Sequence, residues 1–123
     1  MKVAVISDIH GNFQALESVL EDIKNENCDK IWCLGDLAMA GPQPRMVLSY
    51  IMEHGQDWTI IQGNTDKLIT DFSLDIYNAL QKKMPVMANA LLDDCDIIEQ
   101  DKKAFLKSLP IRKEMMIEGV SVL

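Results

Sequence analysis

The sequence predicts an α/β fold in which parallel strands alternate with helices. Three short apolar runs are each followed by a polar loop, and the segments after the first two runs have helical periodicity. Asp8, Asp36 and Asn64 lie in these loops at successive distances of 28 residues. A strand–helix–strand unit is about 30 residues long. Because right-handed crossovers keep neighbouring strands parallel, the three strand ends are expected at one edge of the sheet.

The first two units have clear boundaries. A strand over Val3–Ile6 is followed by Asn12, which can cap a helix whose inward positions are Phe13, Leu16, Leu20 and Ile23. A strand over Ile31–Leu34 leads into a turn-rich loop at residues 40–44. The next helix has the inward positions Val47, Leu48, Ile51 and Met52, with Gly55 as its stop. Thr59–Ile61 is the third strand.

The region after the third strand is predicted to be helical. Residues 67–92 have apolar positions at spacings of three or four, and Pro85 should kink or split the helix. The acidic cluster Asp93, Asp94 and Asp96 lacks the glycine of an EF-hand, so a solvated turn is expected there. A short helix then opens near Asp101 and ends at Pro110. Its expected inward residues are Ala104, Phe105 and Leu109.

The last residues predict a hairpin. Arg112–Ile117 is a strand, Glu118-Gly119 a tight turn, and Val120–Leu123 the start of a returning strand. The chain stops within this apolar strand. We therefore expect a domain that is incomplete at its C-terminus, with an open strand edge through which the chain could form a homo-oligomer.

Composition narrows the function classes. A net charge of −7 disfavours a duplex nucleic-acid binder, which needs a basic face to displace counterions. No apolar run is long enough for a membrane span, and the N-terminus does not resemble a signal peptide, so a cytoplasmic location is expected. Cys28, Cys33 and Cys95 form no C-x-x-C pair and are expected to be reduced, partly buried residues. His54 is expected to be structural or on the surface.

The loop after the first strand predicts a metal site. Asp8 and His10 are two residues apart, so their side chains should lie on one side of an extended segment. A carboxylate and an imidazole in that position can share one cation. The Gly-Asp and Gly-Asn dipeptides that end at Asp36 and Asn64 are ordinary turn signals when taken singly. Their joint placement at one sheet edge favours a metal site over loop chemistry.

These motifs resemble the first three signature blocks of the calcineurin-like metallophosphoesterases, especially small prokaryotic members that have Asp-x-His-Gly-Asn near the start. The residues that carry the resemblance are Asp8-x-His10, Gly35-Asp36, Gly63-Asn64, Gly41-Pro42-x-Pro44 and Ser108-Leu109-Pro110. The resemblance implies a sandwich of α-β-β-α layers, and a single domain over residues 1–123 that corresponds to the N-terminal two thirds of the family domain. The later His-Gly and Gly-His-x-His blocks are missing.

The resemblance also implies the chemistry. Asp8 and His10 would bind a first metal ion, Asp36 would bridge two ions, and Asn64 would bind the second, with Asp36 and Asn64 as the catalytic pair. The ions would be Mn²⁺, Fe²⁺, Zn²⁺ or Co²⁺, all of which accept such mixed ligands. A metal-bound hydroxide would hydrolyse a small phosphomonoester or phosphodiester. The second ion would be weakly held, because the absent C-terminal part supplies three histidines in the family.

Two positions deserve separate interpretation. Many family members have a histidine after the Gly-Asn pair, whereas this chain has Thr65, whose hydroxyl cannot act as a general acid near neutral pH. That difference favours phosphodiesters, or small phosphomonoesters with good leaving groups. Asp66 either orients a metal ligand or a strand end, or is the N-cap of a helix.

Three hypotheses of different classes remain. The first is a phosphoesterase that is active once its missing residues are present. The second is a catalytically impaired metal-binding or regulatory module. The third is a nucleotide-binding domain without metal chemistry, although neither G-x-G-x-x-G nor G-x-x-x-x-G-K-[ST] occurs. The haloacid-dehalogenase-like phosphatases need a second aspartate where His10 stands, which selects against them.

Overall fold

A three-stranded parallel sheet lies at the centre of the molecule. The computed structural model describes residues 1–123. The sheet order is β1-β2-β3, with bounds Val3–Ile6, Lys30–Cys33 and Thr59–Ile60. The register pairs Ile6 with Cys33 and Cys33 with Ile60. The predicted parallel arrangement is therefore confirmed, and all three strands end toward the same edge.

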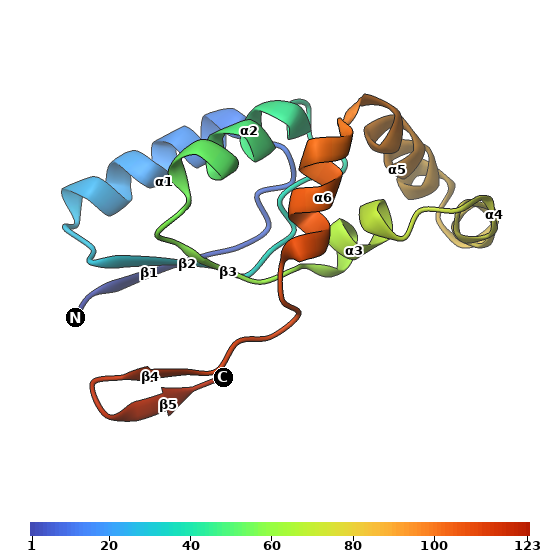
Figure 1. Cartoon of the computed structure of the whole chain (residues 1–123). Coiled ribbons are helices and arrows are strands. Elements are labelled where there is room, and N and C mark those ends of the chain that lie inside the picture. The colour runs from blue at the N-terminus through green and yellow to red at the C-terminus, as the bar shows by residue number, and fades with distance from the viewer.

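Two crossover helices cover one face of this sheet (Figure 1). They are α1 (Phe13–Asn25) and α2 (Pro44–His54). The side chain of Asn12 caps α1 by accepting the Ala15 N–H at 3.0 Å, as expected. Gly55 ends α2, again as expected. The buried residues of these helices pack with the sheet in one core: Leu16, Cys33, Val47, Leu48, Ile51 and Ile60.

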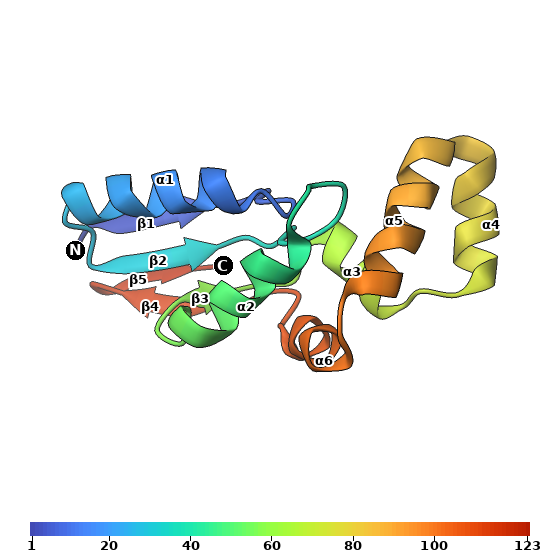
Figure 2. The same ribbon diagram turned by 90° about the horizontal axis from the view of Figure 1, so that it is seen from above.

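Four further helices gather beyond the edge where the strands end (Figures 1 and 2). They are α3 (Asn64–Thr70), α4 (Leu74–Lys83), α5 (Pro85–Ile97) and α6 (Gln100–Ser108). Pro85 begins α5, so it splits the helical region as predicted. A second break separates α3 from α4, where the Ser73 hydroxyl oxygen accepts the Ile76 N–H at 3.2 Å. Neither this break nor the start of α3 at Asn64 was predicted.

Two predictions about this helical region are wrong. The acidic cluster is not a solvated turn, because Asp93, Asp94 and Asp96 all lie within α5 and Asp94 is buried. Ala104 does not face inward. In α6 it is Leu106 that is fully buried, while Ala104 is exposed. The phase of this short helix is set by packing against α3 and α2, which the apolar spacing alone did not resolve.

A two-stranded antiparallel hairpin lies on the face of the sheet opposite α1 and α2 (Figure 1). It consists of β4 (Met115–Ile117) and β5 (Val120–Val122), so the first strand starts at Met115 and not at Arg112 as predicted. The Gln62 N–H donates to the Pro110 carbonyl at 2.7 Å and ties the approach to the hairpin to the end of the sheet. Helices, sheet and hairpin follow one another as α, β and β layers. None of the helices combines the length and apolar character needed to span a bilayer.

Candidate metal centre

Asp8, His10 and Asp36 come together beyond the ends of β1 and β2. One ligand atom from each of them lies within 4.8 Å of the other two. Asp8 is exposed, whereas His10 and Asp36 are partly buried. The parallel register explains this convergence. Ile6 and Cys33, the last residues of β1 and β2, pair directly, so the loops after the two strands begin side by side. Three of the four predicted ligands thus share one small volume.

The backbone at all three residues is left-handed. The φ angles are 57° at Asp8, 47° at His10 and 56° at Asp36. Such conformations are unfavourable for residues other than glycine and persist only where the surroundings hold them. Backbone bonds between the two loops do so here: the Asp8 N–H donates to the Gly35 carbonyl at 3.2 Å, and the His10 N–H to the Asp36 carbonyl at 2.9 Å. The loops therefore fix each other.

The His10 ring is oriented by a carbonyl of the second loop. Its Nδ1 lies 3.2 Å from the Met39 carbonyl oxygen, which can only accept a hydrogen bond. A neutral ring that donates to this carbonyl carries its proton on Nδ1 and has a free lone pair on Nε2. Nε2 lies 3.4 Å from Asp8 Oδ1. This tautomer is the one that presents Nε2 as a metal ligand beside a carboxylate oxygen.

Asp8 is held in its charged form. The Ser7 hydroxyl donates to Asp8 Oδ2 at 2.6 Å. This hydrogen bond lowers the pKa of Asp8, with smaller contributions in the same direction from His10. A carboxylate that ionises below its usual range is available to a cation at neutral pH.

Asp36 is anchored by the start of α3. Thr65 donates to Asp36 Oδ1 twice, from its backbone N–H at 2.9 Å and from its hydroxyl at 2.7 Å. Gly63 comes so near the same carboxylate that a Cβ at position 63 would lie 2.2 Å from Asp36 Oδ1. Only glycine allows this approach. The Gly-Asn-Thr sequence therefore cradles the Asp36 carboxylate.

Asp66 binds the backbone of the loop that contains Asp36. Its side chain is fully buried, and it accepts three backbone N–H groups: Oδ2 from Asp36 at 2.8 Å and from Gly63 at 2.9 Å, and Oδ1 from Leu37 at 2.9 Å. Burial raises the pKa of Asp66, against the lowering by these donors. The bond to Gly63 also closes the first turn of α3. Of the two interpretations from the sequence, the helix N-cap is wrong: the N-cap of α3 is Gly63, and Asp66 is the third residue of the helix, whose carboxylate accepts the N-cap N–H. The bonds from Asp36 and Leu37 fit the interpretation as an orienting residue.

Asn64, the fourth predicted ligand, opens α3 and is exposed. It stands between Gly63 and Thr65, both of which contact Asp36. The structure therefore places its backbone next to Asp36.

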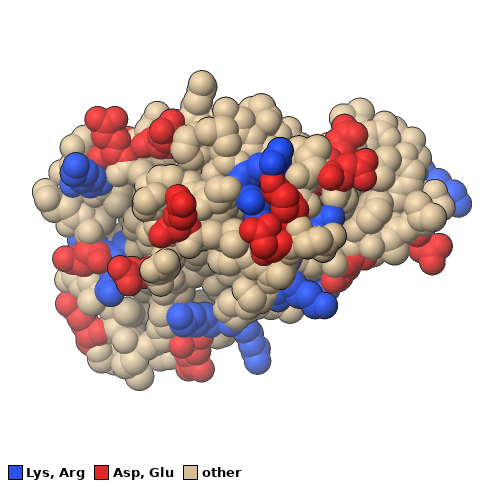
Figure 3. Space-filling model, turned by 45° about the horizontal axis from the view of Figure 1, so that its top comes forward, with Lys and Arg blue, Asp and Glu red and all other residues tan.

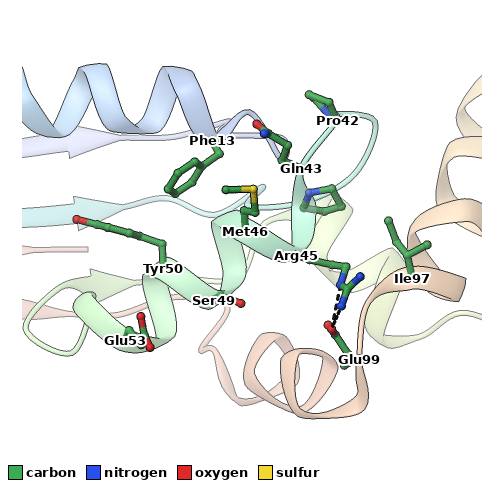
Figure 4. A pocket seen from close by; sticks show the side chains of 11 residues that line it. Phe13, Pro42, Gln43, Arg45, Met46, Ser49, Tyr50, Glu53, Ile97 and Glu99 are labelled. Carbon is green, nitrogen blue, oxygen red and sulfur yellow. Dashed lines mark hydrogen bonds and ion pairs between the residues drawn. The ribbon is translucent and has the colours of Figure 1, made fainter.

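Two hollows border this part of the molecule. One of about 450 Å³ lies against β1 and α1 and includes Asp8 and Asn12 in its wall. A larger one of about 650 Å³ lies between the start of α2 and the junction of α5 and α6, and none of the predicted ligands lines it (Figure 4). There Arg45 pairs with Glu99, which lowers the pKa of Glu99 to about 2. The hollow beside Asp8 is therefore the one relevant to the metal centre.

The donor set fits a divalent cation. Two carboxylates and an imidazole, with ligand atoms within 4.8 Å of one another, suit a divalent ion such as Mn²⁺ or Zn²⁺. The partners behind them, Ser7, Met39 and Thr65, are of the kind that orient metal ligands. Thr65 and Met39 were not assigned these contacts from the sequence. A hydroxyl residue directly after a ligand is a weak signal, and a backbone carbonyl gives none.

The chain is similar in sequence to known proteins over most of its length. An uncharacterized protein of Methanocaldococcus jannaschii is 37% identical over 122 residues, which are 98% of this chain and 47% of that protein. A symmetrical bis(5'-nucleosyl)-tetraphosphatase of Psychromonas ingrahamii is 30% identical over 98 residues, 78% of this chain and 35% of the relative. The chain thus spans about half the length, or less, of these relatives.

Solved structures show the same fold. A hypothetical protein of Pyrococcus horikoshii superposes with a TM-score of 0.81 at 26% identity, over 97% of this chain and 52% of that chain. A metallophosphoesterase of Sphaerobacter thermophilus gives 0.69 at 30% identity, over 95% and 43%. The sequence model of the calcineurin-like phosphoesterases matches residues 1–115. The chain belongs to the calcineurin-like phosphoesterase family.

Proposed function

We propose that this chain carries the first half-site of a metal-dependent phosphoesterase that hydrolyses phosphomonoesters or phosphodiesters. The observation that carries the proposal is that the side chains of Asp8, His10 and Asp36 converge. All three residues also have left-handed backbone conformations, which contacts between the loops maintain. Strain of this kind is typical of functional sites. Family membership supports the reaction class, and the tetraphosphatase relative supports a nucleoside polyphosphate as one substrate to test.

In this proposal the ligands divide between two ions. Asp8, His10 and Asp36 would hold the first ion, and Asp36 and Asn64 would hold the second. Bound divalent ions would supply positive charge to the phosphoryl oxygens and lower the pKa of water. Within this chain the second ion has only Asp36 and Asn64, so it is the weaker one. Residues 1–123 would form one domain, because a single core extends from the sheet to α6.

The residues around the ligands perform the supporting work. Thr65 and Asp66 fix the two sides of the Asp36 loop, and the Met39 carbonyl keeps the lone pair of His10 on Nε2. The Thr65 hydroxyl is already a donor to Asp36, which removes it further from any role as a proton donor to a leaving group. Esters with good leaving groups are therefore the preferred substrates.

Hydrolysis of a chromogenic aryl phosphodiester and of an aryl phosphomonoester with Mn²⁺ tests this function. Turnover that depends on Mn²⁺ and disappears in Asp36→Ala would support activity of this chain alone. Asp22→Ala, which changes an exposed aspartate on α1, is the matched control and should retain the wild-type rate. Equal turnover in the wild type and in Asp36→Ala would refute autonomous activity.

A metal-binding module without catalysis is the second candidate. It is favoured by the unequal ligand count, three residues for one ion and two for the other. Calorimetric titration with Mn²⁺ separates the two: one tight site without turnover supports the module. Two sites with turnover support the enzyme, and no binding contradicts both.

A further inference from the structure

A buried carboxylate on α5 remains unexplained by the metal centre itself. Asp94 is 5% exposed, and its Oδ2 has no hydrogen-bond partner. Burying an unpartnered carboxylate oxygen is unfavourable, which distinguishes Asp94 from the apolar residues around it. Its neighbours in sequence, Asp93 and Asp96, are exposed and need no such explanation.

Asp94 lies on the face of α5 that packs against the loop after β2. The residues around Asp94 on this side are buried: Leu91, Cys95 and Ile98 belong to the same core as Met39. Ala40 lines a hollow together with Met87 and Ala90 of α5. Burial raises the pKa of Asp94 to about 6, and the nearby backbone N–H groups of Met39 and Ala40 partly oppose that rise.

The segment that Asp94 faces is strained. Met39 and Ala40 both have left-handed backbones, with φ angles of 84° and 67°. Two consecutive non-glycine residues in this region need external support. A Cβ on the following residue, Gly41, would lie 1.6 Å from the His10 carbonyl oxygen. The segment therefore also packs closely against the loop after β1. The Met39 carbonyl in turn receives Nδ1–H of His10.

We propose that Asp94 is a positioning residue of the metal centre: it supports the left-handed Met39–Ala40 segment from α5 and, through the Met39 carbonyl, fixes the tautomer and orientation of the His10 ring. It does not touch the metal or the substrate. This inference deepens the proposed function, on which it rests for the identity of His10 as a ligand. It links α5, which supplies none of the predicted ligands, to the edge where they meet.

The tautomer of His10 can be measured without metal or substrate. In a long-range ¹H–¹⁵N spectrum recorded well above the ordinary histidine pKa of about 6.5, the protonated and unprotonated ring nitrogens are distinguished. His10 of the wild type should show Nδ1–H. In Asp94→Ala it should shift toward the mixture of free imidazole, in which Nε2–H predominates. His54 is exposed and serves as the internal reference.

Matched variants separate positioning from general destabilisation. Asp94→Asn keeps an acceptor for the Met39 and Ala40 amides and should retain the wild-type tautomer. Asp93→Ala changes the exposed neighbour on the same helix and should also retain it. If Asp94→Ala does not fold, Asp94→Leu, which fills the apolar surroundings without an acceptor, replaces it.

Mn²⁺ titration gives a second readout. Loss of a partner that orients a ligand weakens metal binding by about 10-fold or more, so we expect that decrease in Asp94→Ala and not in Asp94→Asn or Asp93→Ala. A folded Asp94→Ala or Asp94→Leu protein with the wild-type His10 tautomer would overturn the inference. A wild type without Mn²⁺ binding would refute the metal centre, and the tautomer measurement would still decide the role of Asp94.

Discussion

The Thr65 hydroxyl donates to Asp36 Oδ1 at 2.7 Å, across 29 residues of sequence. The backbone N–H of the same threonine donates to the same oxygen at 2.9 Å. One end of the Asp36 carboxylate is thereby fixed by the first turn of α3. This contact gives a structural role to a residue that the sequence distinguished only by its difference from the family histidine.

Thr65→Val removes this hydroxyl while keeping the shape of the side chain. Because a hydrogen bond to a charged group contributes about 1.5–3 kcal/mol, we expect the free energy of unfolding to fall by about 2 kcal/mol. Urea unfolding of the metal-free protein measures this. Thr70→Val, at the other end of α3, loses exposed hydroxyl bonds to the Lys67 carbonyl at 3.0 Å and to Asp71 Oδ1 at 3.4 Å, and should change stability far less. Equal effects of the two substitutions would contradict the special role of Thr65.

Asp66→Asn should be more destabilising than Thr65→Val. Both carboxylate oxygens of Asp66 accept backbone N–H groups, from Asp36, Gly63 and Leu37. In asparagine one of these oxygens is replaced by an NH₂ group, which would face an N–H donor and cannot accept from it. We expect a loss of about 3 kcal/mol, from the lost bonds and the unsatisfied buried donors. Asp71→Asn, an exposed aspartate after α3 that pairs with Lys67, should cost less than about 1 kcal/mol. Thermal unfolding distinguishes them, and a stability of Asp66→Asn close to wild type would be inconsistent with this network.

Stability should depend on pH through Asp94. Its pKa is raised to about 6 from an ordinary 3.8, chiefly by burial and further by the charge of Asp93. The folded state therefore binds the proton more tightly than the unfolded chain, and the Asp94 contribution to stability decreases as pH rises from about 4 to about 6. Above that range the ionised carboxylate opposes folding by up to about 3 kcal/mol, since one pKa unit corresponds to about 1.4 kcal/mol.

Asp94→Asn should remove this dependence. The variant is expected to be more stable than the wild type at pH 7–8 and to lose that advantage at pH 4, as measured by urea unfolding across the pH range. Asp93→Asn leaves the buried group in place and should keep most of the wild-type profile. A wild-type profile in Asp94→Asn would assign the pH dependence to another group.

Mn²⁺ should stabilise the wild type by mass action. A ligand at 100 times its dissociation constant adds about 2.7 kcal/mol to the free energy of unfolding. Asp8→Asn removes a charged ligand and should abolish most of the shift in unfolding temperature. Asp57→Asn changes an exposed aspartate just before β3, at the opposite end of the sheet, and should respond to Mn²⁺ as the wild type does. An equal shift in both variants would place the bound ion elsewhere.

Surface charge is compatible with a small acidic hydrolase. On the face shown in Figure 3, acidic and basic side chains are interspersed over the helices. This face therefore carries no single acidic region.

The sequence by itself determined the parallel strands, their crossover helices and the edge at which the ligands gather. Those features depend on local patterns, an apolar run, a capping Asn12 or a helix-ending Gly55, and on the fixed length of a strand–helix–strand unit. It also identified Asp8, His10, Asp36 and Asn64 as candidates, because parallel topology converts equal spacing into proximity.

Only the tertiary structure decided how these candidates are held. The buried Asp94, the inward Leu106 and the contacts of Thr65 and Met39 depend on how α3, α5 and α6 pack against the sheet edge. From the sequence, an acidic run such as Asp93, Asp94 and Asp96 is expected to be exposed to solvent. No local pattern distinguishes Asp94, which is the buried one and faces a strained backbone segment. Packing brings residues from distant segments together, and the contacts it creates, more than the helical period, fixed the His10 ring and the Asp36 carboxylate.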